Sequence, residues 1–206
     1  MPRHLQLILI VLIIGICLSG CGGHSSLTPT RSPTSATTLI PISVGQAILT
    51  SDDINASNLI KVDGGSEISD SKGCPIEDCK FFAWNILEPD SLSIAIAEKS
   101  LDLVITLRSF QSSEDANSSA MKVYRENGGN PGIRLIDIPV GILPDTSFVL
   151  AEDGRVISLL SGYQNMVIGI GISASSAGLT DAEKAGLLMT NLAKLQIDKI
   201  IRLGNQ

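Results

Sequence analysis

The chain has 206 residues, of which 44% are hydrophobic and 17% are charged, with 21 acidic against 15 basic side chains and a formal net charge of −6. This composition excludes an intrinsically disordered chain, and its acidic balance argues against a nucleic-acid partner and against a basic surface that binds anionic lipid head groups. The length predicts a single folded domain of ordinary size.

The N-terminus has the parts of a bacterial lipoprotein signal. Arg3 precedes an uncharged, mostly branched apolar run over residues 7–18, which ends in Leu18-Ser19-Gly20-Cys21. A cationic start, an apolar run and small residues before a cysteine follow the order of a secretory signal. The alternative, an uncut transmembrane anchor, needs roughly 20 apolar residues and this run is shorter. We therefore expect residues 1–20 to be removed and Cys21 to carry a diacylglyceryl and acyl lipid.

Residues 21–38 form the predicted tether between this lipid and the domain. They are rich in Gly, Ser, Thr and Pro and show no apolar periodicity. Cleavage removes Arg3, which leaves 14 basic against 21 acidic side chains and a mature net charge of −7. Attachment to the membrane is therefore expected to come from the lipid, with the domain over residues 39–206 on the extracytoplasmic side.

Two cysteines remain once Cys17 has left with the signal and Cys21 has taken the lipid. Cys74 and Cys79 are an even pair in a chain predicted to be exported, which favours a disulfide. The alternative is a thiol or metal pair, but a zinc site needs further ligands and the mature chain has one histidine, His24, which lies in the tether. No metal site is expected.

The first half of the domain shows a change from helical to strand periodicity. The expected elements are a helical turn over 48–54 capped by Thr50 or Ser51, a polar loop around Asp63-Gly64-Gly65, strands over 80–87, 91–98 and 101–110, and a helix from Ser112 or Ser113 to Glu126.

The second half repeats this order. Strands over 146–151 and 155–161 flank the turn Glu152-Asp153-Gly154, a third strand covers 166–173, and Thr180 to Glu183 is a capping box that opens a helix to about Leu203. The sequence thus predicts an α+β domain with an antiparallel sheet of about six strands in a βββα-βββα order and helices packed on it.

Catalytic chemistry is not predicted. The domain has no histidine, so a Ser-His-Asp or Cys-His nucleophile lacks its general base, and no phosphate-binding loop precedes a helix. The adjacent carboxylates fit structural roles in a helix start, the cysteine loop and a hairpin turn, so we expect no enzyme activity and no cofactor.

Small residues in two strands form a candidate binding face. Gly169 and Gly171 alternate with isoleucines, and Ser93 and Ala95 alternate with isoleucines in the predicted strand over 91–98. Small residues in strands let another backbone approach or leave a groove. Either a helix of the chain or an external ligand is expected to lie there.

The segments ILTSDDI, DGRVISLLSGYQNMVIGIGIS and TDAEKAGLLMTNLAKL resemble small cell-envelope lipoproteins and extracellular sensor-type domains of kinases in Gram-positive bacteria, which have an α/β sandwich similar to the PsbP-like fold. This resemblance implies an antiparallel sheet with helices, and ligand or partner binding outside the cell. A lipid-anchored binding or sensor-type module for an unidentified ligand or envelope protein is therefore the leading hypothesis. The alternatives are an accessory structural subunit of an envelope complex and a carboxylate-dependent hydrolase.

Replacing the predicted lipidated cysteine tests the anchor. Cys21→Ser should leave an unprocessed precursor that takes up no label when cells are fed a radiolabelled fatty acid, because the thiol that accepts the lipid is gone. Cys17→Ser, within the signal, should be labelled like the wild type. Continued labelling of the Cys21→Ser chain would contradict the assignment.

Overall fold

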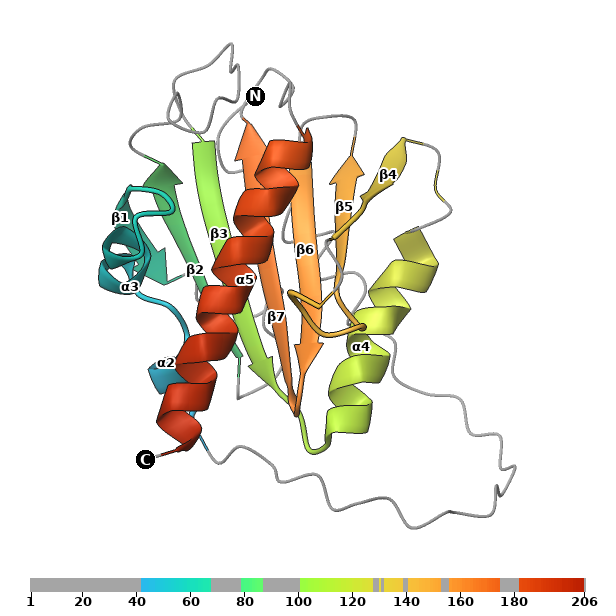
Figure 1. Cartoon of the computed structure of the whole chain (residues 1–206), viewed down its shortest axis with the longest axis horizontal. Helices are drawn as coiled ribbons and strands as arrows, with labels where there is room; N and C mark the ends of the chain where they lie inside the picture. The colour runs from blue at the N-terminus through green and yellow to red at the C-terminus, as the bar shows by residue number, and fades with distance from the viewer. Residues whose placement is uncertain are drawn as a thin grey trace.

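The structure is a computed structural model, and it describes residues 42–67, 79–86, 101–127, 130, 132–138, 141–152, 156–174 and 182–205. Its elements (Figure 1) are α2 Val44–Ala47, α3 Ser51–Ala56, β1 Val62–Glu67, β2 Cys79–Ile86, β3 Leu101–Ser109, α4 Ser113–Asn127, β4 Ile133–Ile136, β5 Phe148–Glu152, β6 Val156–Tyr163, β7 Met166–Ala174 and α5 Ala182–Gly204. The predicted signal, tether and strand over 91–98 lie outside the described residues.

The seven described strands form one open sheet in the order β1-β2-β3-β7-β6-β5-β4. Every neighbouring pair is antiparallel. The two halves of the chain meet where β3 pairs with β7, in a register that runs from Leu101 opposite Ala174 to Ser109 opposite Met166. The predicted α+β class and its antiparallel sheet with helices are confirmed.

The two long helices cover opposite faces of the sheet. Neighbouring residues of a strand point to opposite faces, and the alternation here sorts them into two cores. Under α5 lie Leu103, Ile105, Leu107, Leu159, Ile168, Ile170 and Ile172, packed with Leu188 and Leu192 of the helix. Under α4 lie Phe148, Leu150, Leu160 and Val167, packed with Ala116, Ala120 and Val123.

Strand β1 was predicted to be a polar loop, and that prediction is wrong. Only Val62 of this strand is buried, so it shows no strand-like alternation. Gly64 has a φ of +65°, and the register with β2 shifts between Asp63 and Ser66, as at a β-bulge. A Cβ on Gly65 would come within 2.2 Å of Nε1 of Trp84, so the glycine lets β1 pass over the indole ring.

Strand β4 was not predicted either. It has four residues and lies at the other end of the described sheet, paired with β5 alone. Ile136 is buried whereas Arg134 and Leu135 are exposed. A short strand with one buried end gives too few alternations to stand out in a sequence. The structure therefore has seven described strands where about six were expected, and they differ in part from those predicted.

A buried glutamine of α5 fixes the segment that leads into α3. The side chain of Gln196 has no exposed surface. Its Nε2 donates to the carbonyl oxygen of Ala47 at 2.7 Å, and its Oε1 accepts from the backbone N–H of Leu49 at 2.9 Å. Because Ala47 is the last residue of α2 and Leu49 lies in the segment between α2 and α3, the glutamine supplies the partners that secondary structure does not.

An ion pair continues this attachment one turn further along α5. Thr50 caps α3, as predicted, and forms a capping box with Asp53. Lys199 donates to Oδ2 of Asp53 at 2.7 Å and to the carbonyl oxygen of Ile48 at 2.8 Å. Burial by itself raises the pKa of Asp53, but the hydrogen bonds from Lys199 and Thr50 outweigh burial and hold the pKa below its ordinary value. The ionised carboxylate thus ties α3 to α5.

Replacing the glutamine should weaken the whole domain. Gln196→Leu leaves the buried carbonyl of Ala47 and the buried N–H of Leu49 without partners, at a cost of about 2–4 kcal/mol in the free energy of unfolding. Chemical denaturation measures this change. Lys194→Leu, at an exposed position of the same helix, is the control and should change stability by less than about 0.5 kcal/mol. Equal free energies of unfolding for the two variants would show that the hydrogen bonds of Gln196 do not stabilise the domain.

Candidate functional site

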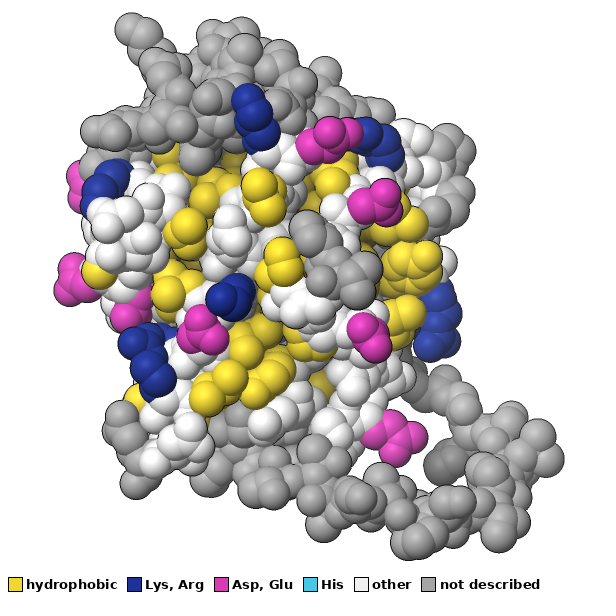
Figure 2. All heavy atoms as spheres, viewed as in Figure 1, with side chains coloured by type: hydrophobic (Ala, Val, Ile, Leu, Met, Phe, Trp, Pro, Cys, Tyr) yellow, Lys and Arg dark blue, Asp and Glu magenta, His cyan; other side chains and the backbone are white. Residues whose placement is uncertain are grey.

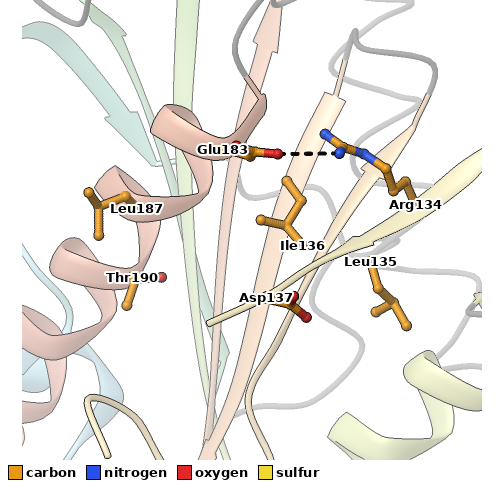
Figure 3. Close-up of a pocket in the computed structure, with 7 residues that line it drawn as sticks. All are labelled: Arg134, Leu135, Ile136, Asp137, Glu183, Leu187 and Thr190. Carbon is orange, nitrogen blue, oxygen red and sulfur yellow. Dashed lines mark ion pairs between the residues drawn. The ribbon is translucent and has the colours of Figure 1, made fainter. Parts of the chain in front are cut away.

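A hollow of about 390 Å³ lies between strand β4 and helix α5. Its volume is in the range of small-molecule sites, roughly 300–1,000 Å³. We call it the β4–α5 hollow, and its lining residues are Arg134, Leu135, Ile136, Asp137, Glu183, Leu187 and Thr190 (Figure 3).

The strand register places the charged and apolar walls of the hollow. Arg134 pairs with Ala151 and Ile136 pairs with Val149, and these two residues of β5 belong to the core under α5. Residues opposite one another on antiparallel strands share a face, so Arg134 and Ile136 lie on the side of β4 that faces the helix. The floor of the hollow is therefore apolar, with a cation at its edge.

An ion pair bridges the two walls. Nη1 of Arg134 lies 3.6 Å from Oε1 of Glu183, in the first turn of α5, and Figure 3 shows the two side chains pointing toward each other. The side chains are 60% and 77% exposed, so solvent screens the attraction and it contributes little to stability. A weak, exposed pair of this kind can open and offer both charges to a ligand.

Helix α5 lies directly against the strand at the floor of the hollow. A Cβ on Gly186 would come within 3.2 Å of Cγ2 of Ile136. Thr190, one turn later, is buried and donates its hydroxyl to the carbonyl oxygen of Gly186 at 2.8 Å. The hydroxyl is thus satisfied within the helix, and the wall that Thr190 provides is mainly its methyl group.

The helix wall of the hollow carries an exposed leucine. Leu187 is 49% exposed, and among the large hydrophobic residues that the structure describes only Leu135, at 39%, and Ile201, at 40%, are comparably exposed. Leu135 pairs with Leu150 of the core under α4, so its side chain lies on the opposite face of β4, as Figure 3 shows. Figure 2 shows the α5 face of the molecule, with hydrophobic side chains along α5 and single acidic and basic side chains between them. Leu187 provides contact area that a partner can bury.

The chemistry of the hollow favours binding without bond cleavage. Its acidic residues are Asp137 and Glu183, and Glu183 is paired with Arg134. Over the described part of the chain, no group of three or more His, Cys, Asp or Glu side chains is placed to hold a metal ion. Apolar contacts with charges at the rim suit an amphipathic ligand or a peptide.

The predicted small-residue face lies on the other side of the sheet. Gly169 and Gly171 are in the centre of β7, opposite Thr106 and Val104 of β3, on the face that α4 partly covers. The hydroxyl of Thr106 donates to the carbonyl oxygen of Gly169 at 3.3 Å, and a Cβ on Gly169 would lie 2.3 Å from that hydroxyl oxygen. Close approach of a threonine thus accounts for Gly169. Ser93 and Ala95 lie outside the described residues, so binding at this face stays a prediction.

The predicted covalent sites fall mostly outside the described part of the chain. Cys21 and Cys74 lie there, and Cys79 is the first residue of β2 and is 9% exposed. The disulfide between Cys74 and Cys79 and the lipid on Cys21 therefore remain predictions.

Sequence reasoning missed every residue of the β4–α5 hollow. Leu187 carried the one usable signal, because it lies off the stripe of Leu188, Leu192 and Leu195 that packs on the sheet. An apolar residue on the polar side of an amphipathic helix is expected to be exposed, as Leu187 is. Its opposite wall belongs to a strand that the sequence did not reveal.

Comparisons with known proteins do not place the chain in a family. No protein-family model and no curated protein matches it. Among solved structures, it is similar to the extracellular domain of PknH from Mycobacterium tuberculosis, with 11% sequence identity over 84% of this chain and 100% of that chain, and a TM-score of 0.43. No described helix has both the length and the apolar character of a membrane span.

The contact between Gly169 and Thr106 can be tested by a double-mutant cycle. Gly169→Ala should lower the free energy of unfolding by about 1–3 kcal/mol, because the threonine side chain is stiff and the new methyl group meets its hydroxyl. Adding Thr106→Ala should recover part of that loss, with a coupling energy of about 0.5–3 kcal/mol.

The control for this cycle is Gly45→Ala. A Cβ at that position meets only Cε of Lys80, at an ordinary 3.8 Å, so no loss of stability is expected. Strict additivity of the changes at Gly169 and Thr106 in chemical denaturation would show that the threonine is not what excludes a side chain.

Proposed function

We propose that the chain is a lipid-anchored, extracytoplasmic binding module that recognises a ligand or an envelope protein at the β4–α5 hollow. The sequence Leu18-Ser19-Gly20-Cys21, followed by a segment rich in Gly, Ser, Thr and Pro over 21–38, supports the anchor and the side of the membrane. The net negative charge of the sequence disfavours attraction to anionic lipid head groups, so in this proposal the lipid holds the chain while the domain stays available for binding.

The observation that carries the proposal is an exposed leucine at a hollow with charged residues at its rim. Leu187 comes from α5 and Ile136, at the floor, from β4, so the apolar surface spans two elements instead of belonging to one. Arg134, Glu183 and Asp137 surround it and can orient a polar group of the bound partner. Surfaces with an apolar centre and a charged rim are typical of recognition sites.

A non-catalytic role agrees best with the acids of the hollow. A carboxylate-dependent hydrolase needs one acid that holds a proton and one that stays ionised. Glu183 is paired with Arg134, and both Glu183 and Asp137 are exposed to solvent, so the two acids of the hollow are not set apart by different environments as such a pair requires.

Site-specific photocrosslinking tests the proposed surface in the full lipoprotein. A photoreactive aromatic residue at position 187, introduced in the cells that make the protein, should form an adduct on irradiation that mass spectrometry can identify. The matched control is position 201 on the same helix, because Ile201 is exposed to a similar extent and lies outside the hollow.

The comparison of the two positions decides the outcome. Adduct at 187 and not at 201 is expected, and it should disappear when Arg134→Glu reverses the charge at the rim. Equal adducts at both positions would indicate a non-specific apolar surface, and an absence of adduct at 187 would overturn the assignment of this hollow as the binding site.

A further inference from the structure

Arg108 is a buried cation that forms no ion pair with any residue that the structure describes. It lies near the end of β3 and is only 3% exposed. Among the residues that the structure describes, its Nε and Nη1 atoms find no hydrogen-bond acceptor, and its guanidinium carbon lies 5.2 Å from the centre of the Phe110 ring. A guanidinium group has five N–H donors and stays protonated in proteins, so this environment leaves strong donors unused.

The strand register supplies no acidic partner for Arg108. Arg108 lies opposite Cys79 of β2 and Val167 of β7, and the next residue of β3 on its own face is Thr106. None of these three paired residues is acidic. Burial of the side chain lowers the pKa of Arg108 to about 10. The side chain therefore remains a cation at neutral pH.

Three described acidic residues are closest to Arg108 along the chain. Glu114 is exposed in the first turn of α4, and Asp115 in the same turn accepts at Oδ2 from the hydroxyl of Ser112 at 2.7 Å, in a cap of that helix. Asp102 is on the same face of β3 but six residues earlier, about 20 Å away along an extended strand. Among the described residues, no carboxylate accepts from Nε or Nη1 of Arg108.

A buried, unpaired guanidinium group is strongly unfavourable unless an anion reaches it. Arginine binds carboxylates and phosphates through two parallel hydrogen bonds, and the guanidinium group of Arg108 lies 5.2 Å from the centre of the Phe110 ring. We propose that Arg108 and Phe110 form a second binding site, on the α4 side of the sheet, for a small ligand that carries an oxyanion, either a carboxylate or a phosphate. This site is separate from the β4–α5 hollow and does not depend on it.

Thermal unfolding of the full mature lipoprotein in detergent tests the site. Trp84, the chain's single tryptophan, is buried in β2 and reports the transition by fluorescence. Succinate and inorganic phosphate are the probes, each compared with sodium chloride at equal ionic strength. At an anion concentration of about ten times the dissociation constant, the preferred anion should raise the Tm by about 3–6 °C. A larger shift with succinate indicates a carboxylate site, and a larger shift with phosphate indicates a phosphate site.

Arg108→Met is the decisive variant. It should lose the response to the anion, and its Tm in anion-free buffer should equal or exceed that of the wild type, because an unpaired buried charge has been replaced by an apolar side chain. Arg202→Met, at an exposed position in the last turn of α5 and outside both sites, is the matched control and should keep the full response. A purely structural arginine would instead give a lower Tm in anion-free buffer, which would overturn the proposal.

Arg108→Lys is a second variant for the same measurement, and it can be used if Arg108→Met does not fold. A lysine keeps the charge but not the planar pair of donors, so the dissociation constant for the anion should rise at least about tenfold. An unchanged dissociation constant in Arg108→Lys, an unchanged response in Arg108→Met, or a wild-type protein that responds to neither succinate nor phosphate would each show that Arg108 is not an oxyanion site.

Discussion

The pairing of β3 with β7 is the contact on which the rest of the structure depends. It joins residues 101–109 to residues 166–174, so it closes the longest loop in the centre of the sheet and costs the most chain entropy. Its register places Leu103, Ile105 and Leu107 on the side of α5, opposite Ile172, Ile170 and Ile168. A shift of this register by one residue would move all of these side chains to the other face of the sheet. The alternation of apolar residues therefore specifies the register.

The centre of this fold could be predicted from the sequence, whereas its two ends could not. Strands β3 and β7 and helix α5 were predicted because each carries several repeats of an apolar period, and a long period is a strong signal. Strands β1 and β4 lie at the ends of the described sheet, where one residue of each faces the core and the others are solvated or nearly so. Such strands are defined by backbone hydrogen bonds to the neighbouring strand. These bonds require no apolar alternation, so the sequence pattern does not reveal them.

The candidate sites were hidden from the sequence for a related reason. The β4–α5 hollow is lined by residues of β4, which was not predicted, and of the N-terminal part of α5, a helix that begins almost fifty residues later. Because these segments are far apart in the sequence, no local motif indicates the hollow. Gln196 is a comparable case: a glutamine within an apolar stripe suggests a solvated position, and only the distant carbonyl of Ala47 and N–H of Leu49 show why a polar side chain is buried there. The sequence analysis did single out the glycines of β7, and the close approach of Thr106 on the neighbouring strand accounts for Gly169.

Buried polar side chains of this domain therefore differ in what they imply. Gln196 has acceptor and donor both satisfied by the backbone, and Thr106 and Thr190 donate to carbonyl oxygens, so each has a structural role that is complete within the chain. Arg108 has none. An apolar side chain of similar length would pack among Cys79, Val167 and Phe110 without the several kcal/mol that a desolvated charge costs. That penalty is comparable with the net stability of an ordinary domain, about 5–15 kcal/mol. A structural role thus gives no reason for an arginine at this position, whereas an oxyanion that binds there would offset the penalty and stabilise the folded state in the same step.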